Sequence, residues 1–173
     1  EINILSNEML KKYNTNDVYI YKTYQMYRKD GLSNFIYDLS CPREYYIGFK
    51  LVRGAYLNED KKFGVLCDSY DETNEQYNKA IEIFTKYSKT NDILLCATHN
   101  EDSIKYAIRE SFRGKHNVEF AQLMGMSDSL SRSLASQGFK TYKYLPYGNL
   151  SESIPYLRRR FYENFPMLMN IFK

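Results

Sequence analysis

Short apolar runs alternate along the chain with longer stretches in which apolar residues recur every three or four positions. The short runs predict β-strands and the longer stretches predict amphipathic helices. The predicted strands cover residues 18–21, 45–52, 93–97, 118–123 and 141–145. The predicted helices cover residues 31–39, 70–87, 101–110, 127–137 and 153–164. Five strand-then-helix units in succession predict an α/β fold with a parallel sheet, either as an open doubly wound sheet or as a barrel.

Several of the predicted helices carry start and stop signals. Asn100 precedes two acidic residues, Glu101 and Asp102, which is typical of a helix N-terminus. Ser153 precedes Pro155, and proline is tolerated in a first turn. Gly138 stands where a helix ends in a left-handed residue, so we expect positive φ there.

Polar or reactive residues follow each of the five predicted strands. In parallel α/β folds the ligand lies beyond the carboxyl ends of the strands. The junctions fall at residues 24–25, 50–56, 98–100, 122–126 and 144–148. We therefore expect these junctions to form one wall of a shared pocket.

Composition narrows the class of protein. The chain has 173 residues, which fits about one domain, and its 24 basic and 21 acidic residues leave a net charge of +3. This balance disfavours a general nucleic-acid binder. No apolar run approaches the roughly 18 residues of a membrane span. Three cysteines without C-x-x-C spacing and two histidines predict neither a disulfide framework nor a metal site, and favour a reducing compartment.

Two strand-end motifs have both a functional and a structural interpretation. Lys50 and Arg53 beside Gly54 suit an anionic ligand, a phosphate or a reduced flavin, but they are equally consistent with solvated cations. The tripeptide from Thr98 to Asn100 either binds a ligand or caps the following helix through Asn100. Taken alone, the tripeptide favours the cap.

The last predicted helix carries the sharpest local pattern. Tyr156, Arg159, Arg160 and Glu163 fall on one side of it. Two guanidiniums beside one aromatic ring can grip a carboxylate in a forked geometry while Glu163 holds one arginine in place. The alternative is a solvated helix face with Arg/Glu pairs, to which Arg158 is expected to belong.

Together these motifs closely resemble the proline dehydrogenase family. The resemblance rests on Lys50-Leu51-Val52-Arg53-Gly54-Ala55-Tyr56-Leu57, Ala97-Thr98-His99-Asn100, Gln122-Leu123-Met124-Gly125-Met126, Lys143-Tyr144-Leu145-Pro146-Tyr147-Gly148 and Pro155-Tyr156-Leu157-Arg158-Arg159-Arg160, with Glu163-Asn164. The segment Thr23-Tyr24-Gln25-Met26-Tyr27 and the stretch from Thr73 to Asn78 fit as well. It covers nearly the whole chain from about residue 18, and it is nearest to the monofunctional, eukaryote-like branch.

The resemblance implies a distorted (β/α)8 TIM-like barrel that binds FAD. Such a barrel needs about 250 residues, so five units correspond to a partial barrel of about strands four to eight. We accordingly expect residues 1–173 to be the C-terminal portion of a catalytic domain. The first residue is Glu1 rather than Met, so we also expect residues upstream of it.

The resemblance also assigns roles to individual residues. The positions that contact the flavin in the family are Gln25, Lys50, Val52, Arg53, Gly54, Thr98, His99, Asn100 and Glu163. The positions that line the proline pocket are Leu51, Tyr56, Tyr144, Tyr156, Arg159 and Arg160. In this assignment the two arginines hold the carboxylate, and the tyrosines and Leu51 enclose the ring.

The implied reaction is the oxidation of L-proline to 1-pyrroline-5-carboxylate, the first step of proline catabolism, with electrons passed to a quinone. Eukaryotic relatives imply a mitochondrial location, with association at a membrane surface, and a non-eukaryotic source would imply a cytoplasmic one. The main alternative is a catalytically inactive fragment or regulatory remnant of the same fold. A third hypothesis, a carboxylate or phosphate binder on a generic α/β fold, requires the motif match to be fortuitous.

Overall fold

The computed structural model describes residues 2–54, 56, 60–114, 117–151, 153–155 and 157–158. Its elements in chain order are α1 (Ile2–Tyr13), β1 (Tyr21–Gln25), α2 (Gly31–Ser40), β2 (Gly48–Val52), the short 3-10 helix η1 (Lys61–Phe63), α4 (Tyr70–Tyr87), β3 (Ile93–Ala97), α5 (Glu101–Gly114), β4 (Asn117–Leu123), α6 (Asp128–Ser136) and β5 (Thr141–Tyr144). The predicted α/β fold with a parallel sheet is confirmed. The helix α1 and η1 were not predicted.

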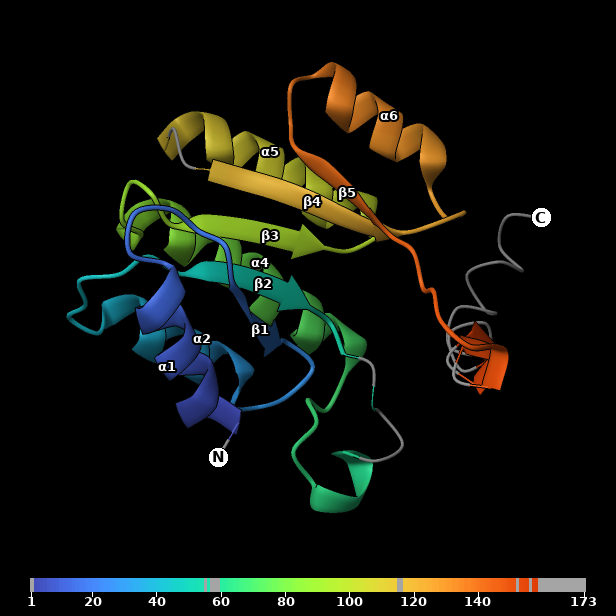
Figure 1. Ribbon diagram of the computed structural model, residues 1–173, viewed down its shortest axis with the longest axis horizontal. Helices are drawn as coiled ribbons and strands as arrows, with labels where there is room; N and C mark the ends of the chain where they lie inside the picture. Colours follow the sequence, from blue (N-terminus) through green and yellow to red (C-terminus); the bar gives the residue numbers. More distant parts are fainter. Residues whose placement is uncertain are drawn as a thin grey trace.

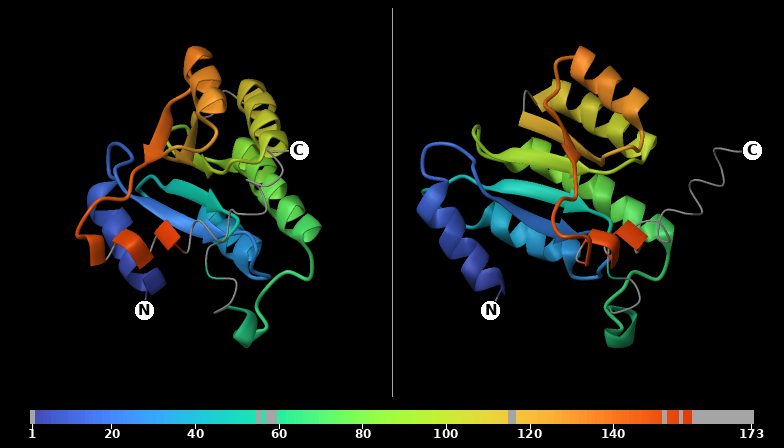
Figure 2. Two further views of the ribbon diagram at one scale, coloured as in Figure 1. Left: turned by 90° about the vertical axis from the view of Figure 1, so that its right-hand side faces the viewer. Right: turned by 45° about the vertical axis from the view of Figure 1, so that its right-hand side comes forward.

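The five strands form one parallel sheet in the order β1-β2-β3-β4-β5 (Figure 1). Each strand lies beside the one that precedes it in sequence, so the order never reverses. A doubly wound sheet needs such a reversal, whereas a barrel adds its strands in sequential order. The sheet is therefore built as an arc of a barrel, and its curvature is visible in Figure 2.

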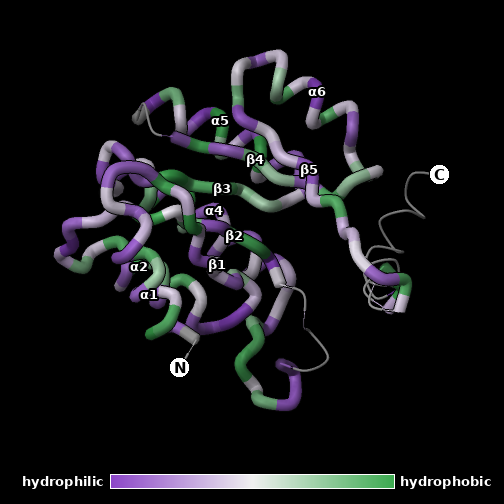
Figure 3. Tube along the Cα trace, in the orientation of Figure 1, coloured by the Kyte–Doolittle hydropathy of each residue, from purple (hydrophilic) through white to green (hydrophobic). Residues whose placement is uncertain are grey.

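The core lies between this sheet and the helices α2, α4 and α5, which cover one face of it (Figures 1 and 2). An aromatic cluster links the two layers: the ring of Phe49 on β2 contacts Tyr24 on β1, Phe35 on α2 and Phe84 on α4, with centroids 5.0–5.7 Å apart. The central strand β3 is hydrophobic over much of its length (Figure 3) and almost fully buried. We call the helix-covered side of the sheet the outer face and the opposite side the inner face.

Local signals explain where the helices begin and end. The Ser69 Oγ accepts from the Glu72 N–H at 3.0 Å, and the Glu72 carboxylate accepts from the Asp68 N–H at 2.7 Å, which caps α4. The Asn100 Oδ1 accepts from the Ser103 N–H at 2.9 Å, so the predicted cap of α5 is confirmed. Gly138 has φ of 87° after α6, as expected.

Two strands begin later than the sequence pattern predicts, because side chains take up the backbone groups that would otherwise extend them. The Asn14 side chain hydrogen-bonds the backbone of Tyr19 and Ile20, so β1 covers residues 21–25 and shares only residue 21 with the predicted strand 18–21. The Ile47 N–H donates to the Asp92 carboxylate, so β2 starts at residue 48 instead of residue 45. The alternation of apolar residues along the chain cannot show that side chains from other segments compete for these backbone groups.

The last predicted helix falls only partly within the described part of the chain. Residues 150–151, 153–155 and 157–158 are helical, so this helix begins before the predicted residue 153. The remainder of 153–164 lies outside the described residues. Among the helices that the structure describes, none is both long and apolar enough to cross a membrane.

Candidate active site at the carboxyl edge of the sheet

Strand pairing decides which of the predicted site residues share a face. In the parallel register Thr23 pairs with Lys50, and Gln25 pairs with Val52. Because side chains alternate between the two faces of a strand, Gln25, Lys50 and Val52 all lie on the inner face. The same register, followed across β3 and β4, places Tyr144 on this face too. The structure thus brings four of the predicted residues to one surface.

Gln25 stands at the end of β1 with an unsatisfied side-chain oxygen. Its Oε1 is buried, and the described residues provide no hydrogen-bond donor to it. An unpaired acceptor removed from water is unfavourable by about 1–3 kcal/mol. Such an atom at the carboxyl edge of a parallel sheet is a signal for a ligand that donates a hydrogen bond there.

Lys50 contributes a cation to the same face. The residue is partly buried, and its side chain makes no hydrogen bond or ion pair with the described residues. Glu119 shares its row through Leu95, two strands away, but the Glu119 carboxylate accepts from the Tyr21 hydroxyl at 2.9 Å and pairs with Lys140 at 3.3 Å. Within the described part of the chain, no carboxylate is paired with Lys50 on the inner face.

Leu51 is placed differently from what the sequence interpretation expects. It follows Lys50 directly, so its side chain points to the outer face, where it is fully buried in the core. The structure therefore does not bring Leu51 together with Lys50 and Gln25. Its predicted contact with the proline ring has no support from the described residues.

Gly54 is required by packing rather than by a ligand in the described structure. Its φ is +143°, and a Cβ at this position would lie 2.2 Å from the Tyr27 ring. The close approach that glycine allows is thus used by Tyr27. The Tyr27 N–H also donates to the Arg53 carbonyl at 2.8 Å, so the loop after β1 and the loop after β2 are packed together.

Arg53 is held by neutral partners on three sides. Its guanidinium donates to Asn74 Oδ1, Thr98 Oγ1 and Ser103 Oγ at 2.6–2.9 Å and lies over the Tyr77 ring at 4.4 Å. These contacts put Arg53 on the helix side of the strand edge, away from Lys50. The two cations therefore serve different parts of the site.

The tripeptide after β3 caps α5, as one of its two interpretations expects, and its binding of a ligand stays a prediction. Thr98 accepts from Arg53, and Asn100 caps α5. The His99 Nε2 accepts from the Leu123 N–H at 3.1 Å, which requires an unprotonated Nε2. Burial, together with the nearby charge of Lys143, holds the pKa of His99 below its ordinary value. His99 is therefore a neutral side chain that ties the ends of β3 and β4 together.

Two tyrosines stand at the rim of this edge. Tyr56 is 42% exposed and Tyr144 is 50% exposed, so both rings retain surface for a ligand. The other four predicted site residues, Tyr156, Arg159, Arg160 and Glu163, lie outside the described residues. Arg158, expected on the solvated face, is exposed. The predicted carboxylate clamp stays a prediction.

The structure also gives roles to residues to which the sequence interpretation assigned none. Asp60 accepts a hydrogen bond from the Tyr27 hydroxyl and pairs with Arg28 at 3.4 Å, which fixes the loop after β2 against the loop after β1. Asn74 and Ser103 hold Arg53. Nothing in their local sequence indicates this role, because each acts across 20 or more positions of the chain.

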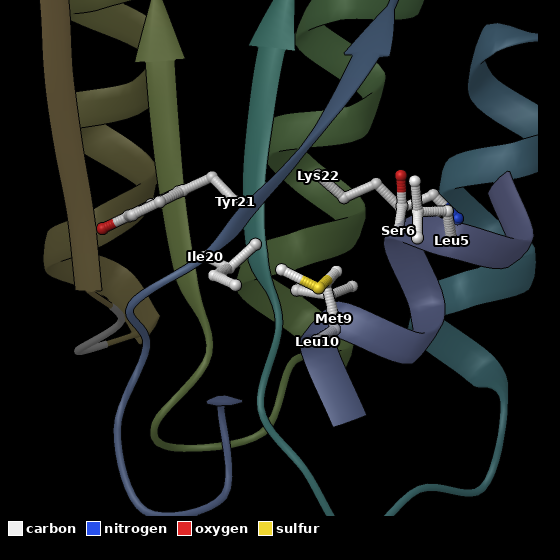
Figure 4. Close-up of a pocket in the computed structure, with 7 residues that line it drawn as sticks. All are labelled: Leu5, Ser6, Met9, Leu10, Ile20, Tyr21 and Lys22. Atoms are coloured by element: carbon white, nitrogen blue, oxygen red, sulfur yellow. The ribbon is translucent and has the colours of Figure 1, made fainter. Parts of the chain in front are cut away.

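A cavity of about 200 Å³ elsewhere on the molecule does not belong to this site (Figure 4). It lies between α1 and the start of β1, and it is lined by Leu5, Ser6, Met9, Leu10, Ile20, Tyr21 and Lys22. Tyr21 precedes Gln25 by four residues, a distance of roughly 13 Å along a strand. No cluster of three or more metal-ligating side chains occurs within the ranges that the structure describes.

Comparison with known proteins identifies the family of this arrangement. The family model described as proline dehydrogenase matches residues 2–168. The chain is 34% identical to proline dehydrogenase 1, mitochondrial, of Homo sapiens and 36% identical to its counterpart in Caenorhabditis elegans, with 96% of this chain and 30% of each relative covered. It is 32% identical to hydroxyproline dehydrogenase of Xenopus laevis, with 99% of this chain and 41% of the relative covered.

The fold is also similar to solved structures. Proline utilization A (PutA) from Bdellovibrio bacteriovorus, inactivated by N-propargylglycine, superimposes with a TM-score of 0.82 at 19% identity, over 94% of this chain and 18% of that protein. The chain thus spans about a third of the length of the curated relatives it matches.

Proposed function

Because this chain belongs to the proline dehydrogenase family, we propose that the protein is a flavin-dependent enzyme that oxidises L-proline to 1-pyrroline-5-carboxylate. The observation that carries the proposal is the pairing of an unsatisfied buried acceptor, Gln25 Oε1, with an available cation, Lys50, on the inner face of adjacent strands. A generic binder of carboxylates or phosphates would need the cation but not the buried acceptor.

The residues at this edge fit a flavin, and we propose FAD as the cofactor. The isoalloxazine has a pyrimidine-like edge with one N–H donor between two carbonyl oxygens. That edge offers the donor that Gln25 Oε1 lacks and acceptors for the Lys50 ammonium. Val52, beside Gln25, supplies apolar surface on the same face. Arg53, Thr98, His99 and Asn100 are proposed to bind the remainder of the cofactor, with Gly54 in the adjoining turn.

The substrate pocket follows from the chemistry of proline, which joins a carboxylate to an apolar ring. We propose that Arg159 and Arg160 hold the carboxylate and that Tyr56, Tyr144 and Tyr156 enclose the ring, with Glu163 beside the arginines. Support for the arginines comes from the family resemblance, since they lie outside the described residues. A forked grip on the carboxylate fixes the orientation of the ring, and such orientation supplies much of the rate in bound reactions.

The cofactor, when bound, would accept the two electrons that leave with the hydrogen of the substrate's C–H bond next to nitrogen, as the C–N single bond becomes C=N and the nitrogen loses a proton. The chain's own residues supply binding and charge. Lys50 presents a positive charge on the inner face and would stabilise negative charge that develops there. His99 stays neutral and keeps the ends of β3 and β4 in register.

We further propose a quinone as the electron acceptor and a mitochondrial location. The names of the human and nematode relatives support the location. Relatives named hydroxyproline dehydrogenase leave a second substrate to be compared with proline.

The test is anaerobic titration of the purified protein with L-proline and with hydroxyproline while flavin absorbance is recorded. We expect a flavin-loaded protein whose absorbance bleaches with proline. Flavin bound without bleaching by either substrate would contradict the proposed reaction and favour an inactive remnant of the fold.

A substitution tests the carboxylate clamp within the same proposal. We expect Arg160→Met to raise KM for proline by about tenfold or more, because one charge-assisted hydrogen-bond pair to the substrate is lost. Flavin content should stay the same. Arg158→Met is the matched control, since Arg158 is exposed and is not assigned to the pocket. An unchanged KM in Arg160→Met would exclude this residue from the clamp.

A further inference from the structure

Arg53 is immobilised by a polar network that spans two helices. Its Nε donates to Asn74 Oδ1 on α4 at 2.9 Å, and its Nη2 donates to Ser103 Oγ on α5 at 2.9 Å. Ser103 in turn donates its hydroxyl hydrogen to Asn78 Oδ1 on α4 at 2.8 Å, which leaves its lone pairs for the guanidinium. The orientation of Arg53 is thus set by side chains outside its own loop.

Every partner in this network is uncharged. Elsewhere in the described residues a partly or fully buried guanidinium meets a carboxylate: Arg43 pairs with Asp92 at 2.6 Å, and Arg28 pairs with Asp30 at 2.9 Å. Arg53 has no such partner in the described ranges, although its guanidinium is partly buried and carries one positive charge shared by five N–H donors. The network holds the cation in place without neutralising it.

The position of Arg53 separates it from the cation on the inner face. Strand alternation puts Lys50 on the inner face, while the contacts of Arg53 put it beside the first turn of α5. A doubly charged group fits this second position better than the flavin ring does.

We propose that Asn74, Ser103 and Asn78 are positioning residues that hold Arg53 as an uncompensated cation for the diphosphate of the flavin nucleotide. This assignment rests on the proposed flavin-dependent function. The neutrality of the network is the essential property, since a carboxylate at position 74 would accept the same hydrogen bond and cancel the charge.

Asn74→Asp separates this role from a purely structural one. The aspartate keeps an acceptor for the Arg53 Nε–H and nearly the same shape. If the network only stabilised the fold, the new ion pair would leave stability equal or higher. If the network preserves a free charge, the folded variant loses affinity for the phosphorylated flavin.

The experiment titrates the purified apoprotein with FAD and, separately, with riboflavin, which lacks the phosphates, and follows the quenching of flavin fluorescence. We expect Asn74→Asp to weaken FAD binding by about tenfold or more, the size of a charge-assisted hydrogen bond, and to change riboflavin binding by less than about twofold. The FAD deficit should shrink with added salt. Ser103→Ala adds no charge and should also weaken FAD binding more than riboflavin binding. The matched control is Ser111→Ala, at a buried serine on the same helix, and it should bind both flavins as the wild type does.

Equal FAD affinity in wild type and Asn74→Asp, or equal losses for FAD and riboflavin, would overturn the positioning roles while the proposed function stands. If Asn74→Asp does not fold, the comparison of Ser103→Ala with Ser111→Ala decides by the same criterion. A wild-type protein that binds neither flavin would overturn the proposed function and this assignment together.

Discussion

Replacing Gln25 by methionine should stabilise the apoprotein and weaken the flavin complex. The two side chains have similar length and volume, so the change removes the amide and leaves the packing nearly intact. The Gln25 Oε1 is buried without a donor among the described residues. Such an acceptor is unfavourable by about 1–3 kcal/mol, and Gln25→Met relieves that penalty in the apoprotein.

The size of the effect can be measured in two ways. For a domain of 173 residues, each 1 kcal/mol corresponds to about 2–4 °C in Tm, so the apoprotein Tm should rise by roughly 2–12 °C. In the complex the lost hydrogen bond should weaken FAD binding by about five- to tenfold. Thermal unfolding of the apoprotein and the loaded protein gives the change in Tm, and FAD titration gives the change in affinity.

The test is strict because Gln25→Met should raise the stability of the apoprotein while it lowers the affinity for FAD. A merely structural glutamine would give a destabilised apoprotein, because its hydrogen bonds would be lost. Thr23→Val, on the same strand and face but with an exposed side chain, is the control and should change neither FAD affinity nor Tm appreciably. An apoprotein that loses stability in Gln25→Met, or unchanged FAD affinity, would refute the reasoning.

Two further predictions concern stability. Asp92→Ala should lower the free energy of unfolding, measured in urea, by about 3–5 kcal/mol, because it leaves the buried Arg43 charge unpaired. Glu101→Ala breaks an exposed pair with Lys105 and should lower it by less than about 1 kcal/mol. Similar losses in the two variants would contradict the role of burial. Since the pKa of His99 is lowered in the folded state, the unfolded chain takes up this proton first as the pH falls through about 6.5, so stability should decline below that pH. His99→Gln should flatten the decline between pH 7.5 and 5.5 in urea unfolding, and parallel profiles for wild type and variant would rule His99 out as its source.

Much of the fold follows from local sequence. The five strand-then-helix units, the cap at Asn100 and the left-handed Gly138 all depend on residues within a few positions of one another. The strand starts were misplaced because Asn14 and Asp92 bind backbone groups of other segments. Such competition depends on which segments meet in space.

For the candidate site too, some features follow from the sequence and others from the tertiary structure. The sequence by itself determined which residue types follow each strand, and its motifs resembled one family strongly enough to assign Gln25, Lys50 and Arg53 to a cofactor. Only the tertiary structure decided which face each side chain occupies: Gln25 and Lys50 share the inner face, Leu51 enters the core, and Gly54 accommodates Tyr27. It also decided which described side chains bind Arg53, since neutral partners from two distant helices meet at its guanidinium. The physical reason is that residue type is fixed along the chain, whereas burial, pairing and charge compensation arise from contacts between segments that only the folded sheet brings together.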